Sequence, residues 1–324
     1  MPKAIVLHEY GGSDVLRLQR ITLKRPEATE ILVRQTAIGV HFHDIYVRTG
    51  LYKTLSLPGI PGLEAAGIVE AVGPGPSIFE IGDRVIYVTG GYGAYASHRI
   101  LPEQLAIKLP ESVSDAAAAA NFSRLLTVQM LMNNVTLLKP SQTILVTAAS
   151  GGVGRLLCQY AKAVGARVIG TVGSAAKGDS AKSYGCDYTF TYNQSGFGCS
   201  VNDITAGKGV DIVYDSVGAK TFDTSLSVLA PLGHLVNFGQ SSGPVGPLAI
   251  SRLAEKSLTL TRPILFHYVS DYNAYHLMAK SALECLRDEM FILPDLQCVP
   301  LKDAAFAHDQ MQLGQGGGSL YLSP

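Results

Sequence analysis

The pattern of apolar and polar positions changes character about a third of the way along the chain. The first 120 or so residues carry short apolar runs such as Ala4–His8, Ile31–Gln35 and Gly67–Ala71, separated by turns rich in glycine and proline. Runs of this length between Gly, Asp and Pro predict short β-strands joined by tight turns. We therefore expect a partly closed β-barrel here rather than a parallel sheet.

The middle of the chain, from Thr143 onward, alternates apolar strands with amphipathic helices. Continuous apolar strands separated by helices indicate a parallel sheet buried on both faces. The expected strands are Ile144–Thr147, Arg167–Val172, Ile212–Tyr214 and Leu235–Phe238, and the clearest helix is Gly152–Val164.

The alternation stops after Arg262-Pro263, where a helix over Asn273–Arg287 and a closing strand over Ser319–Leu322 are expected. A further long apolar helix is expected over Asn121–Leu138. The predicted fold class is α/β: a Rossmann doubly wound domain at residues 124–263, inserted between residues 1–123 and 264–324 of a β-barrel domain. The glycines of 314–318 predict a short turn.

Composition excludes several kinds of protein. Hydrophobic residues make up 47% of the chain and charged residues 16%, so disorder is not expected. The 26 basic and 26 acidic residues balance, which leaves no long-range field to attract nucleic acid. No apolar run reaches about 18 residues and no signal peptide is apparent, so we expect a cytoplasmic protein that does not enter a membrane. The cysteines lack disulfide or zinc spacing and are expected to be reduced: Cys158, Cys186, Cys199, Cys285 and Cys298.

A glycine-rich turn lies between the first strand of the parallel sheet and its helix. Thr143–Thr147 leads into Ala148-Ala149-Ser150-Gly151-Gly152-Val153-Gly154, which is the strand–turn–helix context of a dinucleotide-binding fingerprint. Glycine lets the backbone approach a pyrophosphate, and the helix N-terminus offers N–H groups to it. Ala149 stands at the usual first glycine. The alternative is a tight turn without a ligand. The residues expected at the pyrophosphate are Ser150, Gly151, Gly152, Val153 and Gly154.

The end of the next strand predicts which nicotinamide cofactor binds. A carboxylate there would accept a hydrogen bond from the ribose 2′-hydroxyl and repel a 2′-phosphate. The chain instead has Gly173, Ser174 and Lys177, with no carboxylate before Asp179. Ser174 can donate to a phosphate and Lys177 offers a cation, which favours NADPH over NADH. The alternative is that Lys177 is a solvated helix residue.

Two later loops also end apolar strands in small or polar residues. They are Asp215-Ser216-Val217-Gly218 and Asn237-Phe238-Gly239-Gln240. Ligands of open α/β sheets lie at the carboxyl ends of the strands, so we expect both loops at the nicotinamide half of the cofactor. Ordinary turns are the alternative. The residues expected at the cofactor are Ser216, Gly218, Phe238, Gly239 and Gln240.

Several segments along the whole chain resemble one family. They are Gly11–Leu16, Arg48–Tyr52, Gly62–Gly67, Val72–Gly75, Val213–Gly218 and Thr261–Pro263. With these segments the chain resembles the quinone oxidoreductases related to zeta-crystallin, in the zinc-independent part of the medium-chain dehydrogenase/reductase superfamily. The resemblance implies a GroES-like catalytic domain, a Rossmann domain, an active site in the cleft between them, and a homodimer formed by edge strands of the Rossmann domains.

The resemblance also implies roles for individual residues. By position in the family, Ser174, Lys177 and Tyr192 would contact the 2′-phosphate of NADPH. The nicotinamide would lie near Thr127, Phe238 and Gln240, and Gly173 and Phe266 would also contact the cofactor. Tyr46, Tyr52 and Arg262 would surround the quinone. The chain departs from the family at His41, where Asn is common, and at Gly314-Gln315-Gly316, where an Arg often contacts the cofactor phosphate.

A catalytic metal is not expected. His41 stands where zinc-dependent relatives have their first ligand, a Cys, but their Gly-His-Glu motif here reads Gly62-Leu63-Glu64. One His and one Glu are too few for a typical three-ligand site. We interpret His41 as a hydrogen-bonding residue of the cleft, with a packed structural histidine as the alternative.

These observations predict an NADPH-dependent quinone reductase that works without zinc. Tyr46 and Tyr52 would orient the quinone oxygens, with core or rim packing as the alternative for both tyrosines, and water or His41 would supply protons. One alternative is an NADPH-dependent reductase of enone or enal double bonds. An alternative of another class is a non-catalytic, crystallin-like or RNA-binding protein, although the balanced charge speaks against nucleic acid.

Overall fold

The computed structural model describes residues 1–192, 196–315 and 319–324, and the chain divides into two compact units. Unit 1 comprises Met1–Ser123 and Val269–Pro324, and unit 2 comprises Arg124–Tyr268. The predicted turn at residues 314–318 lies partly outside the described residues. Gly316, one of the positions at which the chain departs from the family, is not among the described residues.

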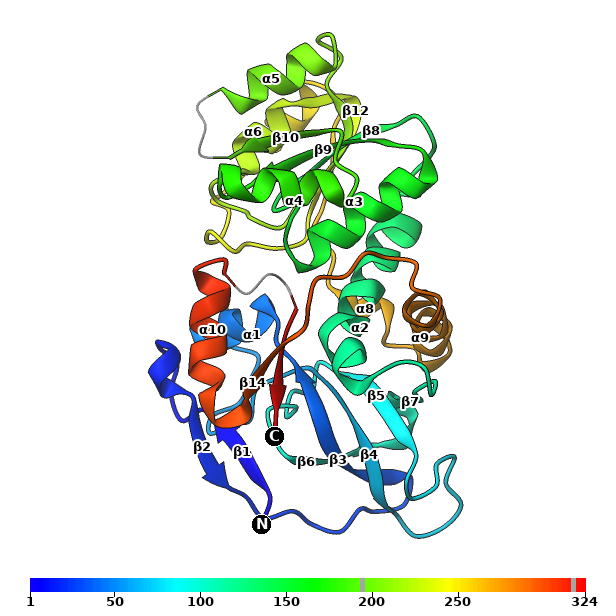
Figure 1. The fold of residues 1–324 in the computed structure, drawn as a ribbon. Coiled ribbons are helices and arrows are strands. Elements are labelled where there is room, and N and C mark those ends of the chain that lie inside the picture. Colours follow the sequence, from blue (N-terminus) through cyan, green and yellow to red (C-terminus); the bar gives the residue numbers. More distant parts are fainter. Residues whose placement is uncertain (193–195, 316–318) are drawn as a thin grey trace. The chain divides into compact units, whose positions relative to one another are not determined.

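Unit 1 is built on a seven-stranded sheet of mainly antiparallel strands (Figure 1). The strand order is β14-β15-β3-β4-β5-β7, and β6 pairs with β3; among the described strands of this sheet, only β14 and β15 run parallel. Two further strands, β1 (Lys3–Val6) and β2 (Arg17–Arg20), form a separate antiparallel pair. The sheet strands are β3 (Glu30–Gly39), β4 (Glu64–Val72), β5 (Arg84–Val88), β6 (His98–Pro102), β7 (Ala106–Lys108), β14 (Gln297–Pro300) and β15 (Leu320–Ser323).

The helices of unit 1 include α1, which carries several of the predicted site residues. α1 (Phe42–Arg48) begins after His41, whose backbone N–H donates to Asp44 Oδ2 at 2.8 Å. A carboxylate in the first turn and a cation in the last complement the helix dipole, and α1 has both. The other helices and short 3-10 turns are α9 (Tyr272–Arg287), α10 (Ala304–Gln312), η1 (Ser13–Val15), η2 (Glu103–Leu105) and η5 (Leu301–Asp303).

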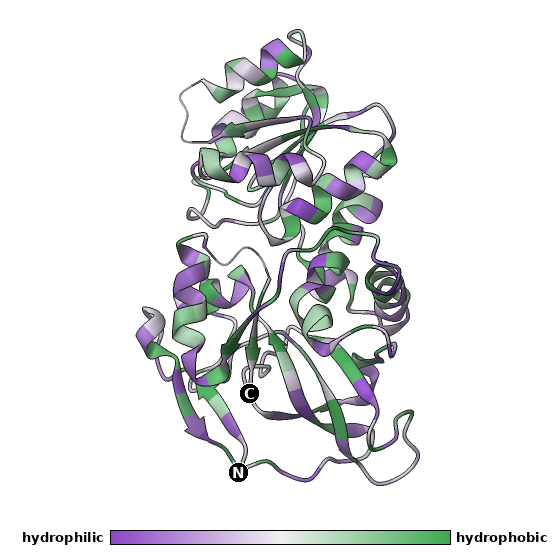
Figure 2. Ribbon diagram, viewed as in Figure 1, coloured by the Kyte–Doolittle hydropathy of each residue, from purple (hydrophilic) through white to green (hydrophobic). Residues whose placement is uncertain are grey.

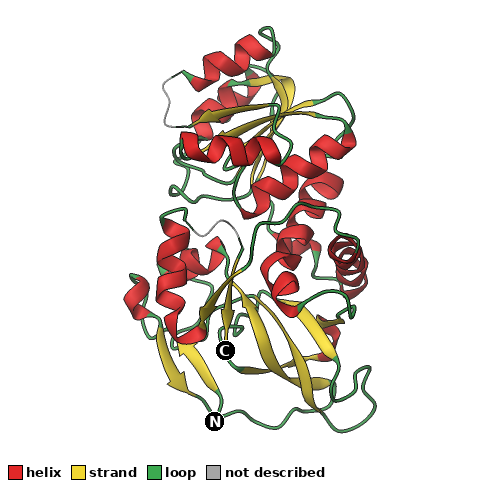
Figure 3. Ribbon diagram, in the orientation of Figure 1, coloured by secondary structure: helices red, strands yellow, loops and turns green. Residues whose placement is uncertain are grey.

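Unit 2 contains a six-stranded parallel sheet in the order β10-β9-β8-β11-β12-β13. Numbered within the unit this is 3-2-1-4-5-6, the order of a dinucleotide-binding fold, and the strand order reverses between β8 and β11. α3 and α4 lie on one face of the sheet, and α5 and α6 on the other (Figures 1 and 3). The strands are β8 (Thr143–Val146), β9 (Arg167–Val172), β10 (Tyr188–Thr191), β11 (Val210–Asp215), β12 (Leu229–Asn237) and β13 (Thr259–Thr261).

The helices of unit 2 follow the amphipathic pattern of the sequence. α3 buries Leu156, Leu157 and Ala161 against β8 and β9, and Gly165 ends it with φ +92°. Apolar residues follow the strands of both units (Figure 2), so each sheet lies in a core of its own. The helices are α3 (Gly152–Val164), η4 (Ala175–Lys177), α4 (Gly178–Ser183), α5 (Phe197–Ile204), α6 (Phe222–Ser227), α7 (Ser251–Ala254) and α8 (Leu265–Tyr268).

The long helix expected over Asn121–Leu138 differs from the structure at both ends. α2 runs from Asp115 to Gln129 and continues as one π-helical turn, η3 (Met130–Val135). The turn ends at Thr136, whose N–H and hydroxyl both donate to the carbonyl of Leu131, at 3.2 and 2.9 Å. In the described part of the chain, no helix combines the length and the apolarity needed to cross a membrane.

Candidate functional site

The glycine turn of unit 2 is held by backbone contacts that require its small residues. Gly151 precedes the first residue of α3, and its N–H donates to the carbonyl of Ala148 at 2.8 Å. A Cβ on Gly154 would collide with that same carbonyl oxygen. The turn is tied to the sheet by the N–H of Ala149, which donates to Thr171 O at 2.9 Å. The N–H end of α3 thus lies beside glycine backbone, and a Cβ on Gly152 would lie 2.8 Å from Nε of Arg124. A helix N-terminus beside glycine backbone suits a pyrophosphate.

The other predicted cofactor loops follow the carboxyl ends of neighbouring parallel strands, and those ends meet at one edge of the sheet. The structure therefore gathers there residues that the sequence separates by several strands and helices. The loops after β8 and β9 contain Ser150, Gly151, Gly173 and Ser174, and the loops after β11 and β12 contain Ser216, Gly218, Phe238, Gly239 and Gln240.

Asp215, at the end of β11, organises these loops, although it was not among the predicted site residues. The carboxylate is fully buried, and its Oδ1 accepts from the hydroxyls of Thr147 and Thr221 at 3.0 and 2.8 Å. It also accepts from the N–H groups of Val217 and Gly218 at 2.9 and 3.2 Å. A buried carboxylate with several donors fixes its loop firmly. A charged residue directly after the apolar run Ile212–Tyr214 was the signal for this role.

The loops after β11 and β12 lie against each other. The N–H of Phe238 donates to the carbonyl of Asp215 at 2.8 Å, and a Cβ on Gly239 would lie 2.6 Å from Ser216 O. Arg262, expected at the quinone, donates from Nη1 to Asn237 O at 2.8 Å. The structure therefore gives Arg262 a contact with the cofactor loops of unit 2.

The residues expected at the 2′-phosphate follow β9 and β10. A Cβ on Gly173 would lie 2.8 Å from the hydroxyl of Tyr192, so the two predicted residues are neighbours. Ser174 is exposed and precedes η4, and the backbone N–H of Lys177 donates to its carbonyl at 3.1 Å. This arrangement fits a phosphate, because a hydroxyl and a cation lie on one short turn. Thr127 in α2 and Phe266 in α8 are partly buried.

His41 in unit 1 belongs to a hydrogen-bonded triangle with Glu64 and Ser123. Its Nε2 lies 2.6 Å from Glu64 Oε2 and 3.3 Å from Ser123 Oγ. Ser123 donates to Glu64 twice, from its N–H to Oε1 and from its hydroxyl to Oε2, both at 2.7 Å. The Glu64 side chain is fully buried and that of His41 is 11% exposed. Neither Glu64 nor Ser123 was predicted as a site residue.

The predicted tyrosines lie in an aromatic cluster of unit 1. The rings of Tyr46 and Tyr52 have centroids 5.0 Å apart and meet edge to face. His43 lies between Tyr52 and Tyr92, with centroids 5.3 and 6.0 Å away, and its Nε2 is 3.1 Å from the Tyr92 hydroxyl. Burial, with a smaller effect from His41, lowers the pKa of His43 to about 4, so this ring is neutral at physiological pH. Phe42 completes the cluster, 5.4 Å from Tyr46.

A second buried network joins α1 to α10. Arg48 can only donate, so its Nη1, 3.4 Å from His308 Nδ1, makes that nitrogen an acceptor. The proton of neutral His308 is then on Nε2, 2.9 Å from the Tyr95 hydroxyl, and Tyr95 donates to Asp44 Oδ2 at 3.1 Å. Burial raises the pKa of Asp44 to about 6 and, with the nearby Arg48, lowers the pKa of His308 to about 3. This network fixes the first turn of α1, next to His41.

Within the described residues, no three His, Cys, Asp or Glu side chains group closely enough to hold a metal ion. His41 and Glu64 instead contact each other directly, at 2.6 Å.

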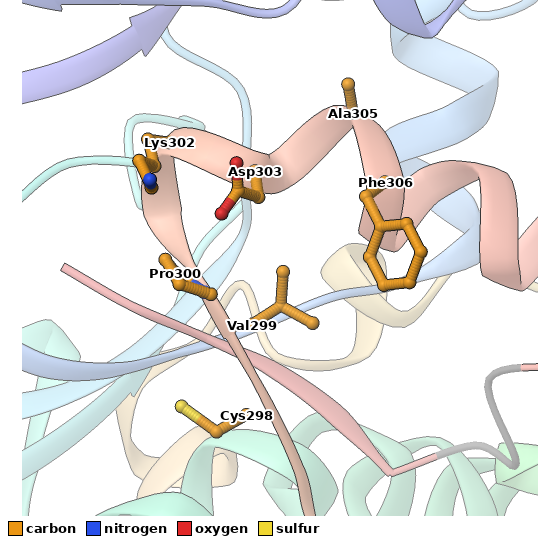
Figure 4. Close-up of a pocket in the computed structure, with 7 residues that line it drawn as sticks. All are labelled: Cys298, Val299, Pro300, Lys302, Asp303, Ala305 and Phe306. Carbon is orange, nitrogen blue, oxygen red and sulfur yellow. The ribbon is translucent and has the colours of Figure 1, made fainter.

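An open groove on unit 1 contains none of the predicted site residues. Its side chains come from β14, η5 and the start of α10, and the view in Figure 4 shows Phe306 and Val299 beside Lys302 and Asp303. The groove therefore adds nothing to the candidate site. Its lining residues are Cys298, Val299, Pro300, Lys302, Asp303, Ala305 and Phe306.

Comparison with known proteins agrees with this fold. A family model described as a zinc-binding dehydrogenase matches residues 152–288, and one described as an alcohol dehydrogenase GroES-like domain matches residues 27–111. The two matches identify the chain as a two-part enzyme fold of the medium-chain dehydrogenase/reductase superfamily, and the predicted fold class is confirmed.

The relatives define the family within that superfamily. Quinone oxidoreductase 1 of Escherichia coli is 40% identical over 100% of both chains. The crystal structure of Escherichia coli quinone oxidoreductase complexed with NADPH has a TM-score of 0.95 at 39% identity, covering 99% of this chain and 100% of that one. A 2-haloacrylate reductase of Burkholderia is 35% identical over 100% of this chain and 99% of its own. The chain belongs to the quinone oxidoreductase family, as its motifs predicted.

Proposed function

We propose that this protein is an NADPH-dependent quinone reductase. The observation that carries the proposal is the set of loops at the carboxyl edge of the unit 2 sheet, where a glycine turn is followed by Ser174 and Lys177 rather than by a carboxylate. Relatives named quinone oxidoreductase, one of them complexed with NADPH, support it.

The proposed roles divide between the two units. The turn at residues 150–154 holds the pyrophosphate, while Ser174, Lys177 and Tyr192 hold the 2′-phosphate. When bound, NADPH supplies the hydride. Tyr46 and Tyr52 orient the quinone through their rings and hydroxyls, and His41 or water gives a proton to the reduced oxygen. No metal takes part in this proposal.

A cofactor and acceptor assay tests the proposed function. We expect chelator-treated protein to oxidise NADPH rapidly with ortho- or para-quinones, and NADH slowly, as followed by the loss of nicotinamide absorbance. Activity that disappears with chelator and returns with zinc would contradict the metal-free proposal. Binding of NADPH without turnover of any acceptor would favour the non-catalytic alternative.

Replacing Lys177 with alanine should reduce the preference for NADPH over NADH by about 10- to 100-fold, because one charge-assisted hydrogen bond worth roughly 1.5–3 kcal/mol is lost. The measurement is kcat/KM with each cofactor. Lys182→Ala is a matched control, because Lys182 is an exposed lysine of α4 that pairs with Asp179 at 3.7 Å. An equal change in both variants would show that Lys177 does not bind the phosphate.

Reduction of activated double bonds is the second candidate function. Its support is the likeness to a 2-haloacrylate reductase over the whole chain, together with a histidine that has a carboxylate partner. The assay separates the two candidates, since turnover of an enone or 2-haloacrylate without turnover of quinones would favour this one.

The proposed cellular setting follows from the sequence and the family resemblance. We propose a cytoplasmic homodimer formed through edge strands of the Rossmann domains. Light scattering on the purified protein measures the oligomeric state, and a monomer would contradict the dimer.

A further inference from the structure

We propose that Glu64 and Ser123 are positioning residues that hold the His41 imidazole in one tautomer, with its proton on Nε2. The inference rests on the proposed function, in which His41 gives a proton to the substrate. Glu64 reaches His41 from β4 and Ser123 reaches it from α2. Both act on the substrate only through His41.

The donors around Glu64 determine where the proton lies. The N–H of Ser123 can only donate, so it occupies Oε1, 2.7 Å away. Oε2 faces the hydroxyl of Ser123 and Nε2 of His41. An ionised carboxylate can only accept, so Nε2, 2.6 Å from Oε2, is the donor of that contact. The proton between His41 and Glu64 therefore belongs to Nε2, and Glu64 is an acceptor for all three contacts.

The surroundings prevent the ring from turning away. A Cβ on Gly39 would lie 2.8 Å from His41 Nε2 and 2.9 Å from Glu64 Oε2, so the backbone of β3 closes that side of the pair. The backbone N–H of His41 is held by Asp44 at 2.8 Å. The residue is thus fixed at its backbone and at its ring, which suits a group that must transfer a proton in one direction.

The tautomer determines which ring nitrogen of His41 can exchange a proton with the substrate. With Nε2–H bonded to Glu64, Nδ1 is the acceptor nitrogen, in agreement with the capping box of α1, in which the His41 side chain accepts from the backbone N–H of Asp44. Protonation of Nδ1 breaks this contact with Asp44. As the quinone accepts a hydride, the imidazolium gives its Nδ1 proton to the quinone oxygen, and the N–H bond breaks as the O–H bond forms. Neutral His41 keeps Nε2–H on Glu64 and takes a new proton from water.

Replacing Glu64 with glutamine tests this assignment. The N–H of Ser123 requires the amide oxygen of Gln, which leaves the amide NH₂ facing His41. Nε2 must then accept, and the ring proton moves to Nδ1. We expect ¹⁵N NMR of the ring to show Nε2–H in the wild type and Nδ1–H in Glu64→Gln. We also expect kcat to fall about 100-fold, with KM for NADPH unchanged.

Matched variants distinguish a positioning role of Glu64 from a general loss of structure. Glu70→Gln changes a carboxylate on the same strand that is 38% exposed and pairs with Arg34, and should alter neither the tautomer nor kcat. Ser123→Ala keeps the backbone donor and should keep Nε2–H, with a fall in kcat of less than about tenfold. A wild-type ring protonated on Nδ1, or a tautomer change in Glu64→Gln without loss of kcat, would overturn the proposal. Wild-type protein with Nε2–H but no quinone turnover would instead refute the proposed function alone.

Discussion

Lowering the pH from 7 to 4 should destabilise unit 1 by about 3 kcal/mol. Buried His308 and His43 have pKa values of about 3 and about 4, below the ordinary 6.5. The unfolded chain therefore binds more protons, and the stability present above pH 6.5 is lost as the pH falls toward those values. Each histidine accounts for about 3 kcal/mol at pH 4. Asp44, whose pKa is raised to about 6, stabilises unit 1 as the pH falls over the same range. This offsets about as much of the destabilisation as one histidine causes.

Urea unfolding at pH 7, 5.5 and 4, followed by pulsed hydrogen exchange of α1 and α10 peptides, measures this effect in unit 1. Replacing His308 with glutamine should remove most of the dependence on pH, whatever its effect at pH 7. His276→Gln is the control, because His276 lies on the exposed side of α9 and bonds to Gln104 O. The same dependence on pH in His308→Gln and in the wild type would contradict the assigned role of His308.

Replacing Gly154 with valine should lower the affinity for NADPH at least about 100-fold. The new Cβ would collide with Ala148 O and lie 3.0 Å from Ala149 Cα, so α3 must move away from the turn. Overpacking of this kind costs about 1–3 kcal/mol and separates the helix N-terminus from the bound phosphates. Fluorescence titration with NADPH measures the affinity.

The control for that variant is Gly246→Ala. A Cβ on Gly246 would meet nothing within 4 Å, so its stability and affinity should match the wild type. If Gly154→Val binds NADPH as the wild type does, the turn is not the pyrophosphate site.

Elements with a complete local signal were predicted well from the sequence. α3 and β9 have the predicted bounds, Gly152–Val164 and Arg167–Val172, because an amphipathic repeat or an apolar run ends there at a glycine or a polar turn. The end of α2 was not predictable in the same way. Its π-helical turn depends on Thr136, whose hydroxyl also contacts Tyr214 at 2.6 Å, a residue 78 positions away.

In the candidate site, too, features with a local sequence signal were predicted and features that depend on distant contacts were not. The glycine turn is local and was recognised, and Tyr46 and Tyr52 were predicted from the family. Glu64 and Ser123 were missed as partners of His41 because the three residues come from separate segments that only folding brings together. A carboxylate within the apolar run at residues 63–66 was the available signal, since a buried charge needs partners. The roles proposed for the individual site residues stay predictions until they are measured.

The insertion of unit 2 into the sequence of unit 1 has a consequence for synthesis on the ribosome. β15 pairs with Ile38 and Gly39 of β3, yet about 280 residues are translated between them. At about 5–20 residues per second, that end of β3 remains without its neighbour for roughly 15 to 55 s. Unit 2 is complete once Tyr268 has emerged, whereas the core of unit 1 still lacks Leu320 and Leu322. The middle of this chain can therefore fold before its beginning does.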